Sequence, residues 1–203
     1  MTRLGRPPAM TTDERRDIVF AAAEELFRVR GFEQVSMNDI AAAAGMSKRT
    51  LYVLFADKQQ LLTELVASSD IWPTGALEES SKDAVEDLRA RLRVIAEHVL
   101  SRRHVGLCRL AIAESLDVPG LSETFLDHAI GRSRASLIET VERIERKRRL
   151  VDLPSTVIAD LLFGAACGNA LMEALLTDEP PDVPRARRVA DEVVASLFRP
   201  ARR

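Results

Sequence analysis

The chain has 203 residues, a length that suits one ordinary domain or two small ones. It carries 29 Lys and Arg against 31 Asp and Glu, and this net charge of −2 excludes a protein that coats nucleic acid through bulk positive charge, though not one with a local basic patch. Apolar residues make up 46% of the chain, which excludes a disordered protein, and aromatics only 4%, which favours a helical fold rich in Ala and Leu.

The first predicted element is an amphipathic helix over residues 13–30, in which apolar side chains recur at helical spacing. Thr11 and Glu14 have capping-box spacing at its start, and Gly31 suits its end. Three short helices follow, and the residues that can cap their N-termini are Ser36, Ser47 and Asp57. Such closely spaced caps indicate tight turns and a compact unit.

Longer helices replace the short ones after the Trp-Pro-Thr-Gly sequence at 72–75. We predict helices over 82–101, about 103–116, about 121–149, 155–177 and 185–198, separated by Pro- and Gly-containing turns. The chain is thus expected to be all-α with about nine helices. We place a first domain at 1–66, with a basic arm at 1–12, and a second domain at 67–203.

The segment 36–62, SMNDIAAAAGMSKRTLYVLFADKQQLL, meets the requirements of a helix-turn-helix. Ala41 permits a close helix crossing, and Gly45 supplies the positive φ that the turn needs. The residues spaced to face inward are Ile40, Ala44, Met46, Leu51 and Leu54. The outward face of the second helix then carries Lys48, Arg49, Thr50, Tyr52 and Val53, a polar, cationic face that suits a major groove.

Residues 12–66 closely resemble the DNA-binding domain of TetR-family transcriptional regulators. The resemblance rests on three stretches in unbroken order, AAEELFRVRGFEQVSM, IAAAAGMSKRTLYVLF and DKQQLL. It implies an all-helical homodimer with an N-terminal helix-turn-helix domain and a C-terminal domain for ligand binding and dimerisation.

Matching positions in the family motif imply which residues contact DNA. They are Ser36, Ser47, Lys48, Arg49, Thr50, Tyr52 and Lys58. Ser36 stands where the family usually has Thr, whereas Tyr52 and Lys58 match a tyrosine and a lysine that contact phosphate. Arg49 is our candidate for base readout, because a guanidinium can make a bidentate contact to guanine, although many family members carry a small residue there.

The arm contains Leu-Gly-Arg-Pro-Pro at residues 4–8, a stiff, cationic sequence that disfavours a helix. Arg6 could enter a narrow minor groove, and many members of the family carry a similar arm. The alternative is a tail without a role in binding.

Several polar or aromatic residues of the C-terminal half are candidates for a ligand pocket: Trp72, His98, His104, Cys108, Phe125, His128, Arg132 and Asn169. The alternative for each is an ordinary surface or interface position. The predominance of aliphatic residues favours an apolar small-molecule effector. The three histidines could converge on a metal, but histidines with ordinary structural partners are the commoner case, so we predict no metal site and no cofactor.

The last two long helices combine apolar stripes with small residues, which we interpret as a dimer surface. The candidates are Leu161, Ala165, Met172, Val193 and Leu197. The family resemblance implies that two helices from each subunit form a four-helix bundle. The alternative is a core within one chain.

Cys108 and Cys167 have no CxxC or zinc-finger spacing, so we expect two buried thiols in a reducing cytosol. The absence of an 18-residue apolar run and of a signal peptide predicts a cytoplasmic protein without a membrane partner. The basic cluster at 146–149 is interpreted as a solvated helix end rather than a second nucleic-acid site.

The function that follows is a ligand-responsive, DNA-binding transcriptional regulator. In the expected mechanism two helix-turn-helix domains occupy major grooves about 34–36 Å apart on a palindromic operator, and a small-molecule effector releases the repressor. The alternative is a small-molecule- or protein-binding helical module on the same fold without operator binding. A helical enzyme finds no support, because no GxSxG, P-loop or HExxH sequence is present.

Overall fold

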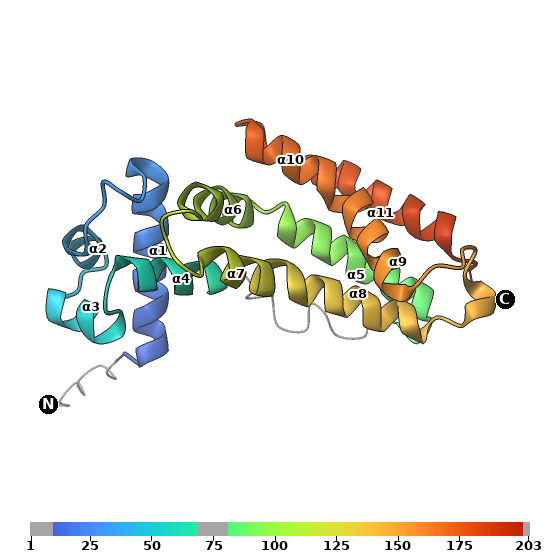
Figure 1. Cartoon of the computed structure of the whole chain (residues 1–203), viewed down its shortest axis with the longest axis horizontal. Coiled ribbons are helices and arrows are strands. Elements are labelled where there is room, and N and C mark those ends of the chain that lie inside the picture. The colour runs from blue at the N-terminus through green and yellow to red at the C-terminus, as the bar shows by residue number, and fades with distance from the viewer. Residues whose placement is uncertain (1–9, 69–80, 201–203) are drawn as a thin grey trace, which may run out of the picture. The chain divides into compact units, whose positions relative to one another are not determined.

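The computed structural model describes residues 10–68 and 81–200 (Figure 1). The chain divides into two compact units, Met1–Leu65 and Val66–Arg203. Every regular element in the described ranges is helical, and the only extended pairing there is an isolated β-bridge between Arg149 and Phe198. The predicted all-α fold is confirmed.

Four helices belong to the N-terminal part of the chain: α1 (Thr12–Arg30), α2 (Met37–Ala43), α3 (Lys48–Leu54) and α4 (Lys58–Ala67). Local hydrogen bonds fix where each begins. Thr11 forms a complete capping box with Glu14 at α1, and Ser36 forms one with Asp39 at α2. The predicted starts of these helices are therefore confirmed.

The two remaining caps use the same chemistry. The backbone N–H of Thr50 donates to the Ser47 hydroxyl at 3.1 Å, and that of Gln60 donates to the Asp57 carboxylate at 2.7 Å. Between α2 and α3 the chain turns at Gly45, whose φ of +63° lies in the left-handed region that other residues adopt at a cost.

The interior of this unit holds the helix-turn-helix together. Ile40 and Leu51 are fully buried, and Ala41 is 2% exposed, as the close approach of α2 to its neighbours requires. Phe27 of α1 packs against Phe32, with ring centroids 5.2 Å apart. Burial of these apolar side chains on one side leaves the opposite side of α3 in solvent.

The C-terminal unit is built from longer helical runs. Their bounds are α5 (Ala84–Val99), α6 (Arg102–Glu114), α7 (Leu121–Phe125), η2 (Leu126–Gly131), α8 (Arg132–Arg143), η3 (Arg146–Arg148), α9 (Ser155–Phe163), η4 (Gly164–Gly168), α10 (Asn169–Leu176) and α11 (Val183–Leu197). Since α7–η2–α8 and α9–η4–α10 each continue without a break, the described residues form nine helical runs besides the short 3-10 turn η3.

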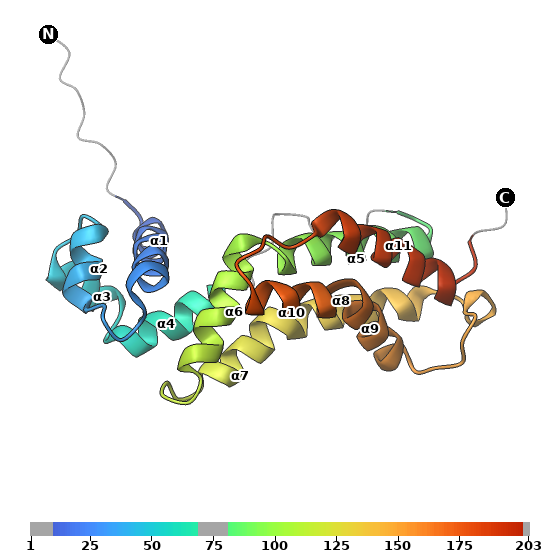
Figure 2. The same ribbon diagram turned by 90° about the horizontal axis from the view of Figure 1, so that it is seen from above.

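Helix α5 is the centre of this unit. It lies between α8 and α11 in Figure 1, and Figure 2 shows α11 running beside it. Leu88, Leu92 and Ile95 of α5 are fully buried in a core that α8 completes with Leu137 and α11 with Val194. These stripes recur at the spacing of an amphipathic helix.

Two of the predicted long helices differ from the observed ones. Each contains a π-helical segment, η2 or η4, where an extra residue per turn shifts the following side chains around the helix axis. The helix predicted over 121–149 also ends early, at Arg143, because Ile144 adopts an extended backbone and buries its side chain.

The basic cluster after α8 is a helix end, as the sequence suggested, but it is solvated only in part, since Arg146 and Lys147 are exposed whereas Arg148 and Arg149 are half-buried. The Arg149 guanidinium donates to the carbonyls of Val141 at 2.8 Å and Ile144 at 3.2 Å, so it caps the C-terminus of α8. Arg148 donates to both carboxylate oxygens of Asp83, at 3.0 and 3.1 Å. These two arginines are structural.

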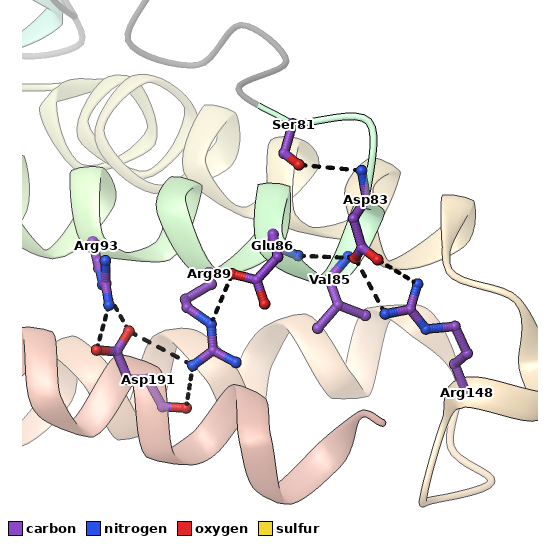
Figure 3. A network of polar contacts seen from close by, with 8 residues as sticks. All are labelled: Ser81, Asp83, Val85, Glu86, Arg89, Arg93, Arg148 and Asp191. Atoms are coloured by element: carbon purple, nitrogen blue, oxygen red, sulfur yellow. Dashed lines mark hydrogen bonds and ion pairs between the residues drawn. The ribbon is translucent and has the colours of Figure 1, made fainter. Parts of the chain in front are cut away.

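A chain of polar contacts ties the ends of the unit together (Figure 3). Asp83 accepts hydrogen bonds from the N–H groups of Val85 at 2.8 Å and Glu86 at 3.2 Å, so it is the N-cap of α5 as well as the partner of Arg148. Asp191 of α11 receives a bidentate bond from Arg93, with Nε 2.6 Å from the carboxylate. α5 is thus fixed to η3 and to α11.

One run of the described residues, Ser155–Leu176, is long and apolar enough to cross a membrane by length and composition alone. Asp160 and Glu173 interrupt its apolar residues, so it contains no unbroken apolar run of 18. In the folded unit its inner side, including Ile158, Leu162 and Cys167, lies in the core. It is therefore a helix of the bundle with one apolar face exposed.

Candidate DNA-binding surface and ligand site

Helix α3 presents the candidate base-reading face. Leu51 is its one buried residue, whereas Tyr52 is 52% and Val53 79% exposed, and Lys48 and Arg49 also lie in solvent. A seven-residue helix that buries a single leucine leaves its remaining faces to contact a groove.

The hydroxyl groups predicted to contact DNA already have structural partners. Ser36 bonds to the carboxylate of Asp39, and this hydrogen bond lowers the pKa of the carboxyl. The Ser47 and Thr50 hydroxyls lie 2.9 Å apart. These three side chains therefore fix where α2 and α3 begin, and this in turn fixes which side of α3 faces solvent.

Lys58 is more deeply engaged than its motif position suggests. Its ammonium donates to the carbonyl of Phe32 at 2.7 Å and approaches that of Glu33 at 3.4 Å, and it lies 4.1 Å from the centroid of the Phe32 ring. An ammonium has three N–H donors, so the third remains for an acceptor outside this loop. The residue therefore joins α4 to the chain after α1.

The motif did not identify a basic cleft beside α3. The cleft has a volume of about 350 Å³ and is lined by Thr12, Arg15, Arg16, Arg49, Thr50, Val53 and Leu54. Sequence reasoning assigned Arg49 and Thr50 to DNA but not Arg15 or Arg16. The paired arginines on the first helix were the available signal, but only the packing of α1 near α3 places them beside Arg49.

In the C-terminal unit, three of the predicted pocket residues come together. The ring centroids of His98 and His104 lie 5.4 Å apart, and those of His104 and Phe125 lie 6.3 Å apart. Cys108 follows His104 by one turn of α6 and is 2% exposed. By contrast, His128, Arg132 and Asn169 are exposed, as in the alternative interpretation.

His104 is the unusual member of this group. It is 4% exposed, and its Nδ1 atom has no hydrogen-bond partner within the described part of the chain. Burial, reinforced by the nearby charges of His98 and Arg103, lowers the pKa of His104 to about 4. The imidazole is therefore neutral near pH 7 and offers a buried polar atom to a bound molecule. Burial also raises the pKa of Cys108 to about 12, so its thiol stays protonated.

The candidate dimer residues fall into two groups. Leu161 is 46% and Met172 57% exposed, and Ala165 lies in solvent, so the α9–α10 run has an uncovered apolar side. Val193 and Leu197 of α11 are instead partly buried against the core of their own chain. Two candidates of other kinds, Arg6 for DNA binding and Trp72 for the ligand pocket, lie outside the described residues.

Two families of known proteins match the chain, each over one part of it. The family of bacterial regulatory proteins called tetR matches residues 19–65, and the family described as the C-terminal domain of AefR-like transcriptional repressors matches residues 86–199. Together these matches span the helix-turn-helix and nearly all of the described C-terminal unit.

Individual relatives agree with this result. The chain is 29% identical to the transcriptional regulator EthR of Mycobacterium tuberculosis over 198 residues, which cover 95% of this chain and 88% of the relative. It is 27% identical to EthR of Mycolicibacterium smegmatis over 191 residues, 91% of this chain and 83% of the relative. A crystal structure of a TetR-family regulator from Mesorhizobium loti superimposes with a TM-score of 0.77 at 23% identity, covering 94% of this chain and 100% of that one.

Proposed function

Since the chain belongs to the tetR family of bacterial regulatory proteins, we propose that it represses transcription from a near-palindromic operator and that a small molecule bound in its C-terminal domain releases it. The chain is a ligand-responsive, DNA-binding transcriptional regulator and not an enzyme, and regulators of this family act as dimers. Family membership decides against a helical module that lacks operator binding. A cytoplasmic location is part of the proposal.

The observation that carries the DNA contact is the exposed face of α3. Lys48, Arg49 and Tyr52 extend from a helix whose opposite side is anchored by Leu51. We assign base readout to Arg49, and phosphate contacts to Tyr52 and to the third N–H of Lys58. Ser36, Ser47 and Thr50 act mainly by holding the helix termini, and Arg6 is proposed to enter the minor groove.

The test is a selection of genomic fragments followed by titration at several salt concentrations. Wild-type protein should enrich a palindrome and bind it with strong salt dependence. A variant with Lys48, Arg49 and Lys58 all replaced by Ala should lose this binding, and Arg49→Ala alone should cost about 1–3 kcal/mol and relax the preference at one base position. Equal binding by wild type and the triple variant would refute the DNA assignment.

We place the effector beside His104, with His98, Cys108 and Phe125 as neighbours. The support is a buried, neutral imidazole whose Nδ1 lacks a described partner, next to an aromatic ring. A largely apolar molecule with one group that hydrogen-bonds to Nδ1 fits this environment. Such a ligand releases DNA only if it binds the released state more tightly than the DNA-bound state.

The effector site can be tested without knowing the ligand in advance. A thermal-shift screen of small apolar molecules should yield compounds that stabilise the wild-type protein and weaken its hold on DNA. For such a compound, His104→Phe should reduce the stabilisation while leaving DNA binding without the compound intact. An unchanged thermal shift in that variant would move the site elsewhere.

The subunit contact is assigned to the α9–α10 run. Leu161, Ala165 and Met172 provide an apolar surface that is exposed in the single chain, and a second copy would remove it from water. Val193 and Leu197 contribute less directly, because they are partly occupied with their own core.

A further inference from the structure

The cleft beside α3 combines positive charges from two different helices. Arg15 and Thr12 come from the first turns of α1, whereas Arg49 and Thr50 come from α3. No residue in the lining is acidic. A volume of about 350 Å³ is ample for a phosphate group, and guanidinium groups bind phosphate through paired, charge-assisted hydrogen bonds.

The arginines of the cleft differ in the contacts that they make within the protein. Arg16 is held by the fold: it donates to the carbonyl of Leu54 at 3.4 Å, pairs with the carboxylate of Glu64, and lies 4.7 Å from the centroid of the Phe55 ring. It therefore forms a fixed wall that ties α1 to the end of α3 and to α4. A role in stability explains this arginine fully.

Arg15 and Arg49 are not held by contacts of this kind. Within residues 10–68 and 81–200, neither guanidinium forms an ion pair or a side-chain hydrogen bond. The acids nearest to Arg15 in sequence are Glu14, whose carboxylate is taken up by the capping box at Thr11, and Asp13 and Asp17, which are exposed and not part of the cleft lining. Both guanidinium groups are thus available to an anion from outside.

We infer that Arg15, beside the base contact proposed for Arg49, binds a backbone phosphate of DNA at the rim of the groove that α3 enters. A helix in a major groove is flanked by phosphates on both sides, and residues beside the reading helix meet them. The inference rests on the proposed DNA-binding function and adds to it a contact made by α1. The N-terminal segment 1–66 has nine Lys and Arg against nine Asp and Glu, so one further phosphate contact is a substantial part of its electrostatic attraction.

The experiment compares full-length wild type with Arg15→Ala, Arg15→Lys and Arg28→Ala on the enriched operator and on a scrambled duplex. Arg28 is the matched control, since it lies on the same helix but is paired with Glu25 at 2.6 Å. Arg15→Ala should weaken binding to both duplexes by about 5- to 20-fold and lower the salt slope by about 0.9. Arg15→Lys should keep the slope, and Arg28→Ala should match wild type.

Two results separate failure of this inference from failure of the proposed function. If wild type binds its operator but Arg15→Ala keeps the wild-type affinity and salt slope, Arg15 contacts no phosphate and the inference is overturned. If wild type itself enriches no sequence, the proposed function fails instead, and titration of a mixed-sequence duplex at low salt still tests Arg15. Unfolding midpoints of all four proteins show whether a loss of binding reflects a loss of folding. If Arg15→Ala is destabilised, the salt slope of Arg15→Lys decides instead: a wild-type slope supports the phosphate contact.

Discussion

Lys58 has a structural role besides the DNA contact proposed for it. Its ammonium contacts two carbonyl oxygens and a ring face from the segment after α1, 26 residues earlier in the chain for the closer carbonyl. Lys48, at the start of α3, is exposed. The two lysines therefore separate charge that stabilises the unit from charge that only faces solvent or DNA.

Replacing each lysine by Ala should distinguish these roles. Lys58→Ala should lower the free energy of unfolding by about 1–2 kcal/mol, because the loop carbonyls lose a donor and the Phe32 ring a cation, and it should also weaken DNA binding to all sequences. Lys48→Ala should weaken DNA binding with little change in stability. Urea unfolding and duplex titration measure both quantities; an unchanged unfolding free energy for Lys58→Ala would contradict the structural role.

The buried imidazole of His104 should make stability depend on pH. Its pKa is about 4 when folded against an ordinary value of 6.5, so the unfolded chain binds the extra proton between these values. The stabilisation is fully present above pH 6.5 and is lost as the pH falls toward 4.

We expect His104→Gln to remove about 2 kcal/mol of the difference in unfolding free energy between pH 7 and pH 5. His128→Gln, which changes an exposed histidine, is the control and should keep the wild-type pH profile. Urea titrations at a series of pH values provide the measurement. Parallel profiles for all three proteins would show that His104 is not held neutral by the fold.

At the level of secondary-structure elements, the first turn of α5 is held by a single residue with two roles. Asp83 both caps the helix and pairs with Arg148, and this pairing, with help from the backbone N–H groups, holds the pKa of the carboxyl below its usual range (Figure 3). The cap satisfies backbone donors that the helix cannot, whereas the ion pair joins α5 to η3.

Two substitutions divide these contributions. Asp83→Asn keeps a side-chain acceptor for the cap but loses the ion pair, whereas Asp83→Ala loses both and should cost about 1 kcal/mol more in unfolding free energy. The penalty of Asp83→Asn should shrink as the pH falls below the ordinary pKa of an aspartate, because the unfolded wild-type chain then binds a proton, and it should vanish only below the lowered pKa of the folded carboxyl. Equal stabilities for Asn and Ala at pH 7 would argue against a capping role.

For the whole molecule, the apolar outer side of α9–α10 is the feature that calls for a partner. Leu161 and Met172 are about half exposed, and Leu176 is 77% exposed. The α9–α10 run is long and apolar enough to span a membrane, yet the side opposite these residues packs in the core. We propose that a second copy of the chain covers this face, which would leave the helix in its own bundle.

A double substitution, Leu161→Glu with Met172→Glu, should therefore shift the protein from dimer to monomer, since each subunit would bury charges against the other. Val29→Glu is the control, because Val29 is 62% exposed on α1, outside this face. Analytical ultracentrifugation gives the mass, and operator binding should fall with the dimer. A wild-type monomer, or a dimer that survives the double substitution, would place the contact elsewhere.

Much of this fold could be predicted, because it depends on contacts between residues that are close in sequence. The caps at Thr11, Ser36, Ser47 and Asp57 each bond to a backbone group three residues away, so the residues that decide where those helices begin are adjacent in sequence. Gly45 likewise marks its turn by itself, through its positive φ. The exposed face of α3 followed from the spacing of Leu51 among polar neighbours.

Packing between distant segments decided the rest. The bond from Lys58 to Phe32, the cleft shared by Arg15 and Arg49, and the rings of His104 and Phe125 all join residues about twenty or more positions apart. The π-helical segments also escaped prediction, because a period of 3.6 residues carries no mark where one turn gains a residue. A cap needs only its own turn of helix, whereas a cleft, a buried imidazole or a shared ammonium exists only after the helices have packed together.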